Sequence, residues 1–180
     1  MPAIDELEKT VTGLEIIWRA FELRPEPEPL PDATSEFFTN MWESSIYPLA
    51  ESLRVKIKMP TVKPRSRIAH QAAKWAETYG KFNEFKGEIF RAYFERDENI
   101  GELETIVSAV QNIDLDSDEL RTVIERNEFL EMVLADEEAA RELGISGVPA
   151  FIANRKAGMM GIQSVGNLRN LVEQVKTVSS

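Results

Sequence analysis

The side chains that most often carry enzyme chemistry are scarce in this chain. It contains no cysteine, which removes disulfide, thiolate-nucleophile and zinc-thiolate chemistry. His70 is the only histidine, and histidine is the side chain whose ordinary pKa suits a general base near neutral pH. Any metal site would have to use oxygen ligands, and we expect neither a metal nor a bound cofactor.

His70 lacks the surroundings that a general base requires. It lies between Ala69 and Gln71 in a helical pattern, and no nucleophile that it would activate is identifiable. A packed or capping histidine is the commoner case at such a position. We therefore assign no catalytic residue.

A candidate binding element is the turn formed by Gly147, Val148 and Pro149, which leads from a helical pattern into an apolar run. A proline at the first residue of a strand costs no ladder hydrogen bond, and the glycines before it permit close backbone approach. This setting favours a cis Val148–Pro149 bond, although cis is the minority form before proline. The alternative interpretation is a tight strand entry without a binding role.

A second candidate is the one basic concentration of the sequence, which contains Lys63, Arg65 and, between Arg65 and Arg67, Ser66. Its functional interpretation is an anion-binding mouth for a thiolate or for the carboxylates of a small ligand. The alternative is a solvated face balanced by nearby acids, and such faces are the more common case.

Composition limits the partners and the location that we expect. The chain has 180 residues, 43% of them hydrophobic and 29% charged, and a formal net charge of −10. Nucleic acid and anionic membrane are disfavoured as partners because both need a positive surface. There is no apolar run long enough to span a bilayer and no basic-then-apolar leader, so we expect a soluble, cytoplasmic protein.

Helical patterns occupy most of the middle of the chain, after a short first helix at residues 2–11 that Thr12 and Gly13 end. Asp116, Ser117 and Asn127 are the expected N-caps, and Gly144 is an expected C-cap. A final amphipathic helix follows the hairpin. The expected helices span residues 35–53, 65–79, 81–96, 101–112, 117–126, 128–143 and 165–175.

Strand patterns flank this helical region. Residues 14–21 form a compact apolar run typical of a strand that is covered on both faces. Residues 144–163 have the pattern of a helix end, a Gly-Val-Pro turn, a short strand, a polar turn at 154–156 and a second short strand, which predicts a hairpin. The prolines at residues 25, 27 and 29 exclude helix and ladder alike, so that we expect an extended surface connector there.

These features together resemble one known family. Residues 147–151 (Gly-Val-Pro-Ala-Phe), with the hairpin and the Gly-x-Gln at 161–163, are similar to the end of the thioredoxin fold in DsbA-type thiol-disulfide oxidoreductases, particularly the FrnE-like branch. Residues 16–25 resemble the second strand of that branch, and residues 64–70 and 90–94 resemble its lid helices. The resemblance covers nearly the whole chain from Leu14 to Val175.

The resemblance implies an α/β, thioredoxin-like fold with a large all-helical insertion. Its Cys-x-x-Cys follows a first central strand, whereas this chain begins near the middle of the first helix. We therefore expect an N-terminally truncated form without that strand. The expected domains are a thioredoxin-like core at 1–24 and 144–180 and a helical insertion, or lid, at 25–143.

The resemblance leaves three functions open. The first is a DsbA/FrnE-like family protein that is redox-inactive in this cysteine-free form, either because the start of the chain has been lost or because the reaction has been given up. The second is a glutathione-dependent isomerase or transferase of the same fold, in which a serine can replace the thiol. The third is a non-enzymatic module that binds peptides.

The implied partners follow from these alternatives. In the family, the residue before the cis proline offers its backbone N–H and C=O to an extended peptide, a role that falls here on Val148. The ligand would then be an extended peptide or a small thiol. Loss of a central strand would leave sheet edges unpaired, and we expect a homodimer that covers them.

Overall fold

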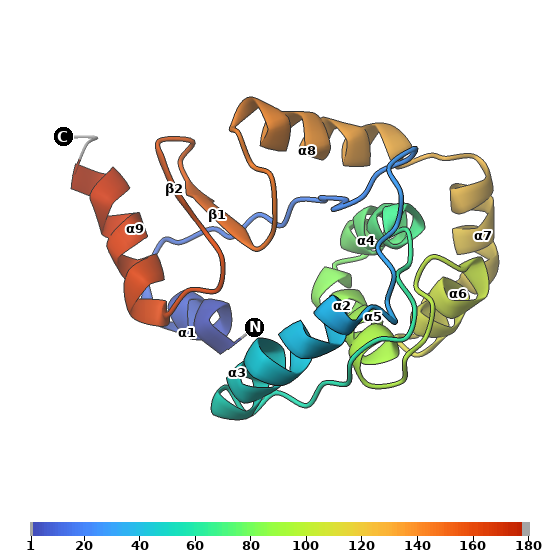
Figure 1. Cartoon of the computed structure of the whole chain (residues 1–180). Coiled ribbons are helices and arrows are strands. Elements are labelled where there is room, and N and C mark those ends of the chain that lie inside the picture. Colours follow the sequence, from blue (N-terminus) through green and yellow to red (C-terminus); the bar gives the residue numbers. More distant parts are fainter. Residues whose placement is uncertain (1, 178–180) are drawn as a thin grey trace.

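The structure is a computed structural model that describes residues 2–177. Its helices pack in two groups, one around a small hairpin and one that forms the helical middle of the chain (Figure 1). The elements in chain order are α1 (Pro2–Thr10), α2 (Glu36–Met41), the π-helix η1 (Trp42–Ile46), α3 (Tyr47–Ser52), α4 (Arg67–Thr78), α5 (Phe82–Phe94), α6 (Leu103–Gln111), α7 (Ser117–Glu125), α8 (Leu130–Glu142), β1 (Ala150–Ala153), β2 (Ala157–Met160) and α9 (Val165–Thr177).

The larger hydrophobic core lies among α4, α5, α6 and α7. Its most enclosed large side chains include Phe85, Ile106 and Leu120, each no more than 1% exposed. The apolar residues of these helices recur at helical spacing, so one face of each helix turns toward the same centre. The helical pattern of the sequence is therefore confirmed, with helix ends within a few residues of those expected.

The smaller core joins α1, α9 and one face of the hairpin. Ile4, Leu7 and Leu168 are its buried centre, and Phe151 and Met159 pack against them from β1 and β2. The strands are antiparallel, with Phe151 opposite Met159. Since side chains alternate along a strand, the other face of the hairpin points away from this core.

Residues 14–21 do not form a strand, which corrects the prediction. They run as an extended segment whose residues alternate between more and less exposed from Leu14 to Ala20, and Ile17 is 57% exposed. The segment is thus covered on one face and not on both. A strand is defined by a hydrogen-bonded neighbour, and within residues 2–177 the hairpin is the only sheet.

The proline-rich connector is a turn and not the extended spacer that we expected. The Glu28 N–H donates to the Pro25 carbonyl at 2.9 Å, and the Glu26–Pro27 peptide is cis, the arrangement of a type VI turn. The fixed φ of proline favours an extended backbone, but here the hydrogen bond between Glu28 and Pro25 closes the four residues into a turn.

The helix caps agree with the sequence in part. The Asp116 carboxylate accepts hydrogen bonds from the N–H groups of Asp118 and Glu119, and Gly144 adopts a left-handed φ of 69° after α8, so both predicted caps are confirmed. Ser117 and Asn127 are not N-caps. Ser117 is the first residue of α7, and Asn127 takes a left-handed φ of 52° in the turn before α8, whose N-cap position is Phe129.

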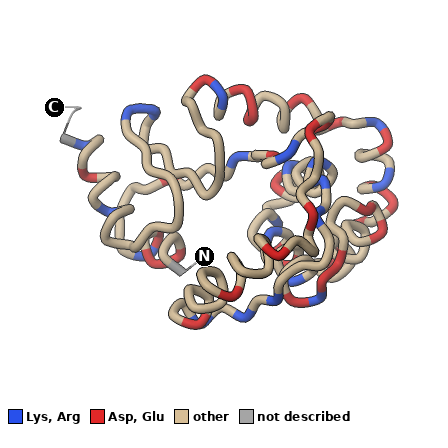
Figure 2. The backbone as a smooth tube through the Cα atoms, viewed as in Figure 1, with Lys and Arg blue, Asp and Glu red and all other residues tan. Residues whose placement is uncertain are grey.

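Charged side chains are spread over the helices, whereas the two hairpin strands carry none (Figure 2). In the part of the chain that the structure covers, every helix is too short or too polar to cross a bilayer. The division into a core at 1–24 and 144–180 and an insertion at 25–143 stays a prediction.

Candidate functional site

The turn predicted as a binding element connects the end of α8 to β1. The Val148–Pro149 peptide is cis, and the Pro149 carbonyl accepts a hydrogen bond from the Gly161 N–H at 2.8 Å. Proline has no N–H to return this bond to Gly161, which is tolerated because Pro149 stands at the end of the ladder, one residue before β1. The hairpin therefore fixes Pro149 at its open end.

The same hydrogen bond sets which backbone groups of β1 are free. In an antiparallel ladder, hydrogen-bonded and non-hydrogen-bonded pairs alternate. Because Pro149 faces Gly161 as a bonded position, Phe151 and Ala153 also turn their N–H and C=O groups toward β2. The corresponding groups of Ala150 and Ile152 turn the other way. No described residue hydrogen-bonds to them or to the backbone of Val148, which lies in the bend before the strand.

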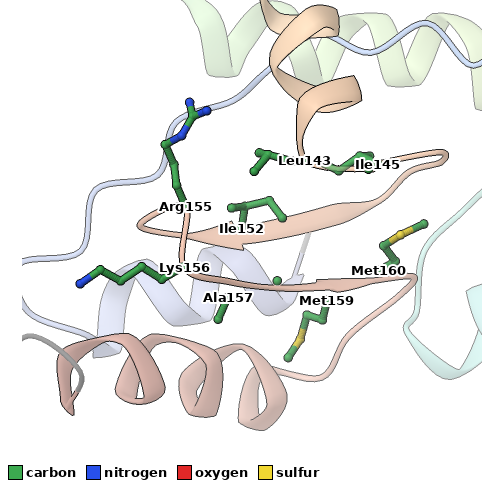
Figure 3. Close-up of a pocket in the computed structure, with 10 residues that line it drawn as sticks. Leu143, Ile145, Ile152, Arg155, Lys156, Ala157, Met159 and Met160 are labelled. Carbon is green, nitrogen blue, oxygen red and sulfur yellow. The ribbon is translucent and has the colours of Figure 1, made fainter.

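Side chains beside this free edge are apolar and exposed. Val148 is 49% exposed and Ile152 40%. In Figure 3, Met159 and Ala157 point toward α9, while Ile152 and Met160 point to the opposite side, where Leu143 and Ile145 lie. That side holds a hollow of about 540 Å³, with Arg155 and Lys156 at the hairpin turn.

No steric crowding requires a glycine at position 147. A Cβ placed on Gly147 would meet no atom within 4 Å, and its φ lies outside the left-handed region. By contrast, a Cβ on Gly158 would lie 2.5 Å from the Ile152 Cδ1. The glycine that shapes this face is therefore Gly158, because the Ile152 side chain lies across it.

The three residues predicted as an anion-binding mouth do not converge on one point. The Arg65 guanidinium donates to the Glu28 carbonyl at 2.6 Å and to the Arg24 carbonyl, holding both ends of the proline turn. The Lys63 Nζ lies 3.1 Å from the centre of the Phe38 ring. Ser66 precedes α4 and, among the described contacts, makes no side-chain capping bond.

Burial lowers the pKa of Lys63 to about 8, because its ammonium has exchanged part of its hydration for the Phe38 ring. The Lys63 ammonium therefore contacts the Phe38 ring within the protein. Two of the clustered basic residues, Lys63 and Arg65, thus make contacts within the protein. The role of this cluster as an anion site stays a prediction.

His70 is a packed histidine, as its helical position suggested. Burial lowers the pKa of His70, while the charge of Glu22 and a hydrogen bond to the Phe21 backbone act in the opposite direction. The imidazole thus lies between α4 and the extended segment. It is part of a larger buried set of charges that links three elements.

This buried set was missed in the sequence. The Asp136 carboxylate of α8 accepts hydrogen bonds from the Arg19 guanidinium at 2.8 Å and the Ala20 N–H at 2.9 Å, and it pairs with Lys74 at 2.7 Å. Burial acts to raise the pKa of Asp136, but these partners outweigh it and hold the pKa below its ordinary value. The available signal was spacing, since Asp136 shares the buried face of Val133 and Ala140.

A second buried acid lies next to it. The Glu22 carboxylate, whose side chain is 2% exposed, accepts a hydrogen bond from Arg67 at 2.6 Å. Burial, with the charge of Glu22 and a hydrogen bond shared with it, raises the pKa of Glu137. These acids fasten residues 19–22 to α4 and α8; among residues 2–177, no histidine and acid cluster suits a metal ion.

Comparison with known proteins places the chain among relatives of known fold. The family model described as a DSBA-like thioredoxin domain matches residues 1–173. An uncharacterised protein of Bacillus subtilis (strain 168), YwbO, is 32% identical over 151 residues, which are 81% of this chain and 76% of that protein.

Two solved structures are similar in fold. A probable DsbA oxidoreductase from Streptomyces coelicolor superposes with a TM-score of 0.82 at 21% identity, covering 96% of this chain and 81% of that one. A presumed protein disulfide isomerase from Nitrosomonas europaea gives a TM-score of 0.73 at 14% identity, covering 99% of this chain and 90% of that one. At these identities the likeness shows the fold alone.

Proposed function

The chain belongs to the DSBA-like thioredoxin domain family, and from this premise we propose that it binds an extended peptide along the free edge of β1 without exchanging disulfides. The α/β thioredoxin-like fold with a helical insertion supports this reading of the hairpin. The proposal assigns to this chain the peptide binding of a disulfide-exchange protein and not its redox reaction.

The chemistry is limited by composition. Thiol-disulfide exchange proceeds by attack of a thiolate on a disulfide sulfur. The chain contains no cysteine, so its own side chains cannot supply that thiolate. What its residues can do is hold a peptide by backbone hydrogen bonds.

One observation carries the proposal: the N–H and C=O groups of Ala150 and Ile152 face away from β2, and no described residue hydrogen-bonds to the backbone of Val148. A peptide that adds as a strand to such an edge gains main-chain hydrogen bonds without side-chain chemistry. Its affinity would depend little on sequence, and the exposed Val148 and Ile152 would favour apolar residues beside them.

The glutathione-dependent alternative has less support from the contacts. It needs cationic side chains directed at carboxylates, whereas Arg65 is bonded to backbone carbonyls and Lys63 lies against Phe38. We therefore do not propose a glutathione site at Lys63, Arg65 and Ser66.

Amide hydrogen exchange measured by NMR tests the peptide proposal directly. In the free protein we expect fast exchange at Ala150 and Ile152 and slower exchange at Phe151, whose N–H bonds to β2. A saturating apolar peptide should slow exchange at Val148, Ala150 and Ile152 by at least about tenfold and leave Phe151 little changed. Phe151 is thus the internal control.

Two results would contradict the proposal. One is saturable peptide binding that leaves the three edge amides as they were. The other is the absence of saturable binding by a panel of extended apolar peptides. The homodimer and the cytoplasmic location expected from the sequence stay predictions, which sedimentation velocity and cell fractionation can check.

A further inference from the structure

Two acidic side chains meet where the extended segment ends, and an arginine lies against them. Glu22 follows the segment, Glu137 belongs to α8 and Arg67 begins α4. We propose that Glu22 and Glu137, here called the carboxyl pair, hold one proton between them, and that this proton keeps residues 20–22 attached to α8. Release of the proton loosens this attachment, so the carboxyl pair is a pH-sensitive contact between the extended segment and the helical middle of the chain.

The two carboxyl groups are close neighbours in an enclosed place. The Glu22 side chain is 2% exposed, and its carboxylate accepts a hydrogen bond from the Arg67 guanidinium at 2.6 Å. The Glu137 carboxyl lies within hydrogen-bonding reach of the Glu22 carboxyl, and the charge of Arg67 acts on both acids. One cation is thus shared between two acids.

One oxygen of Glu137 indicates where the proton lies. Glu137 Oε1 is buried, and no donor among residues 2–177 reaches it. An ionised carboxylate can only accept hydrogen bonds, so a buried oxygen without a donor is unfavourable. A proton on Glu137 makes its carboxyl a donor to Glu22. It also removes the repulsion between two carboxylates that share one site.

The other cations of this region are engaged with other partners. Asp136, one residue earlier on α8, pairs with Arg19 and Lys74. Arg65, which precedes α4, donates to two backbone carbonyls at the proline turn. Within the described part of the chain, Arg67 is therefore the one cation at ion-pair distance from either acid of the carboxyl pair.

Two further titratable groups face the carboxyl pair. His70 of α4 lies near Glu22, and burial lowers the pKa of His70, so that its imidazole carries no positive charge at neutral pH. Glu26 of the proline turn lines a hollow of about 190 Å³ together with Glu22 and Arg67, and its charge also acts on Arg67. Neither group supplies a positive charge that a second carboxylate would need.

Loss of the proton to solvent turns Glu137 from a donor into a second carboxylate beside Glu22. Repulsion then replaces the hydrogen bond between them. Glu22 lies two residues after Ala20, whose N–H is held by the Asp136 carboxylate of α8 (Figure 1). The repulsion therefore acts directly beside the hydrogen bond that joins the extended segment to α8, and residues 20–22 separate from the helix more readily.

The direction of the pH effect follows from the surroundings of Glu137. Burial, the charge of Glu22 and the hydrogen bond shared with it raise the pKa of Glu137 above its ordinary value of 4.5. The folded chain thus keeps a proton that the unfolded chain releases. The contribution of the carboxyl pair to stability is fully present below pH 4.5 and is lost as the pH rises through the folded-state pKa of Glu137.

Amide hydrogen exchange of the whole protein, measured by NMR between pH 4.5 and 8, tests the proposal. The protection factor of the Ala20 amide should fall by at least about tenfold as Glu137 ionises, since tenfold corresponds to one unit of pKa. Glu137→Gln keeps a donor beside Glu22 at every pH and should lack this fall. Both proteins contain His70, so its titration cancels in the comparison.

Glu138→Gln is the matched control. It removes the same charge one residue later on α8, where Glu138 pairs with Arg141 in solvent at 2.8 Å, and it should keep the fall of the parent protein. An equal fall in the parent and in Glu137→Gln would overturn the proposal, because residue 137 cannot ionise in that variant.

A second measurement uses the unmodified protein and so does not depend on how a variant folds. In a carbon-13 NMR titration of the side-chain carboxyl groups, the Glu137 carbon should titrate above pH 4.5. A midpoint at or below 4.5 would mean that both acids are ionised side by side, and the shared proton would then be ruled out.

Discussion

The Ala20 N–H donates a hydrogen bond of 2.9 Å to the Asp136 carboxylate, which joins the extended segment to α8 across most of the chain. The same carboxylate pairs with Lys74 of α4, whose side chain is 9% exposed. One buried acid thus connects three elements. Because Lys74 and Ala20 are buried with it, its removal leaves a cation and a backbone donor without compensation.

Asp136→Asn should reduce the free energy of unfolding by about 3 kcal/mol, because the variant leaves Lys74 buried without its counter-ion. Urea denaturation measures the loss. Glu138→Gln is the control: Glu138 pairs with Arg141 in solvent, and its loss should stay within about 0.5 kcal/mol. Equal effects of the two substitutions would contradict the structural role of Asp136.

The pH dependence of stability should carry a contribution from His70. Burial lowers the pKa of His70 in the folded chain, so below about pH 6.5 the unfolded chain binds a proton that the folded chain does not. The contribution of neutral His70 to the free energy of unfolding is therefore fully present above that pH and is lost as the pH falls. The total loss is about 1.4 kcal/mol for each unit by which folding lowers the pKa of His70.

His70 is the only histidine, so its imidazole signals in an NMR titration are unambiguous. They should titrate below pH 6.5 in the folded protein. His70→Gln should lose less stability than the parent between pH 7.5 and 5.5. A folded-state pKa at or above 6.5 would contradict the prediction that burial outweighs the charge of Glu22 at His70.

Two glycines should respond oppositely to alanine. A Cβ on Gly87, inside α5, would meet only the Arg91 side chain, at 3.5 Å, so Gly87→Ala should raise the free energy of unfolding by about 0.5–1 kcal/mol. A Cβ on Gly101 would lie 2.9 Å from the Arg65 carbonyl oxygen, so Gly101→Ala should lower it by about 1–3 kcal/mol.

Thermal and urea unfolding of both variants check this pair. The comparison is informative because the same methyl group is added in each case. Similar destabilisation by both substitutions would mean that the approach of Gly101 to the Arg65 backbone is not close.

The placement of the larger core predicts a contrast between two phenylalanines. Phe85 is 1% exposed, and Phe85→Ala should cost about 3–5 kcal/mol, since the lost ring leaves a cavity. Phe37 is 79% exposed on α2, and Phe37→Ala should change stability by no more than about 0.5 kcal/mol. A large loss at Phe37 would show that α2 is covered in solution.

Local patterns predicted most of the elements. Helical spacing gave α4 to α9, and Asp116 and Gly144 marked two of their ends because capping depends on neighbours a few residues away. The hairpin was predicted for the same reason: Asn154 and Arg155 adopt φ values of 49° and 56°, and their turn needs only the residues beside it.

Contacts between distant residues could not be predicted in this way. An apolar run such as 14–21 becomes a strand only if another strand bonds to it, and this depends on the whole chain. The sequence around Lys63 and Arg65 could not predict that Lys63 contacts Phe38 and that Arg65 binds two carbonyls at the proline turn, because these partners are distant in sequence.

The sequence by itself determined that these 180 residues contain no thiol and that the Val148–Pro149 turn opens a hairpin, because both depend on residue type and local order. Only the tertiary structure decided which backbone groups of β1 are free and that Asp136 holds the extended segment. Hydrogen bonds and burial join residues far apart in sequence, and their partners are set when the chain packs.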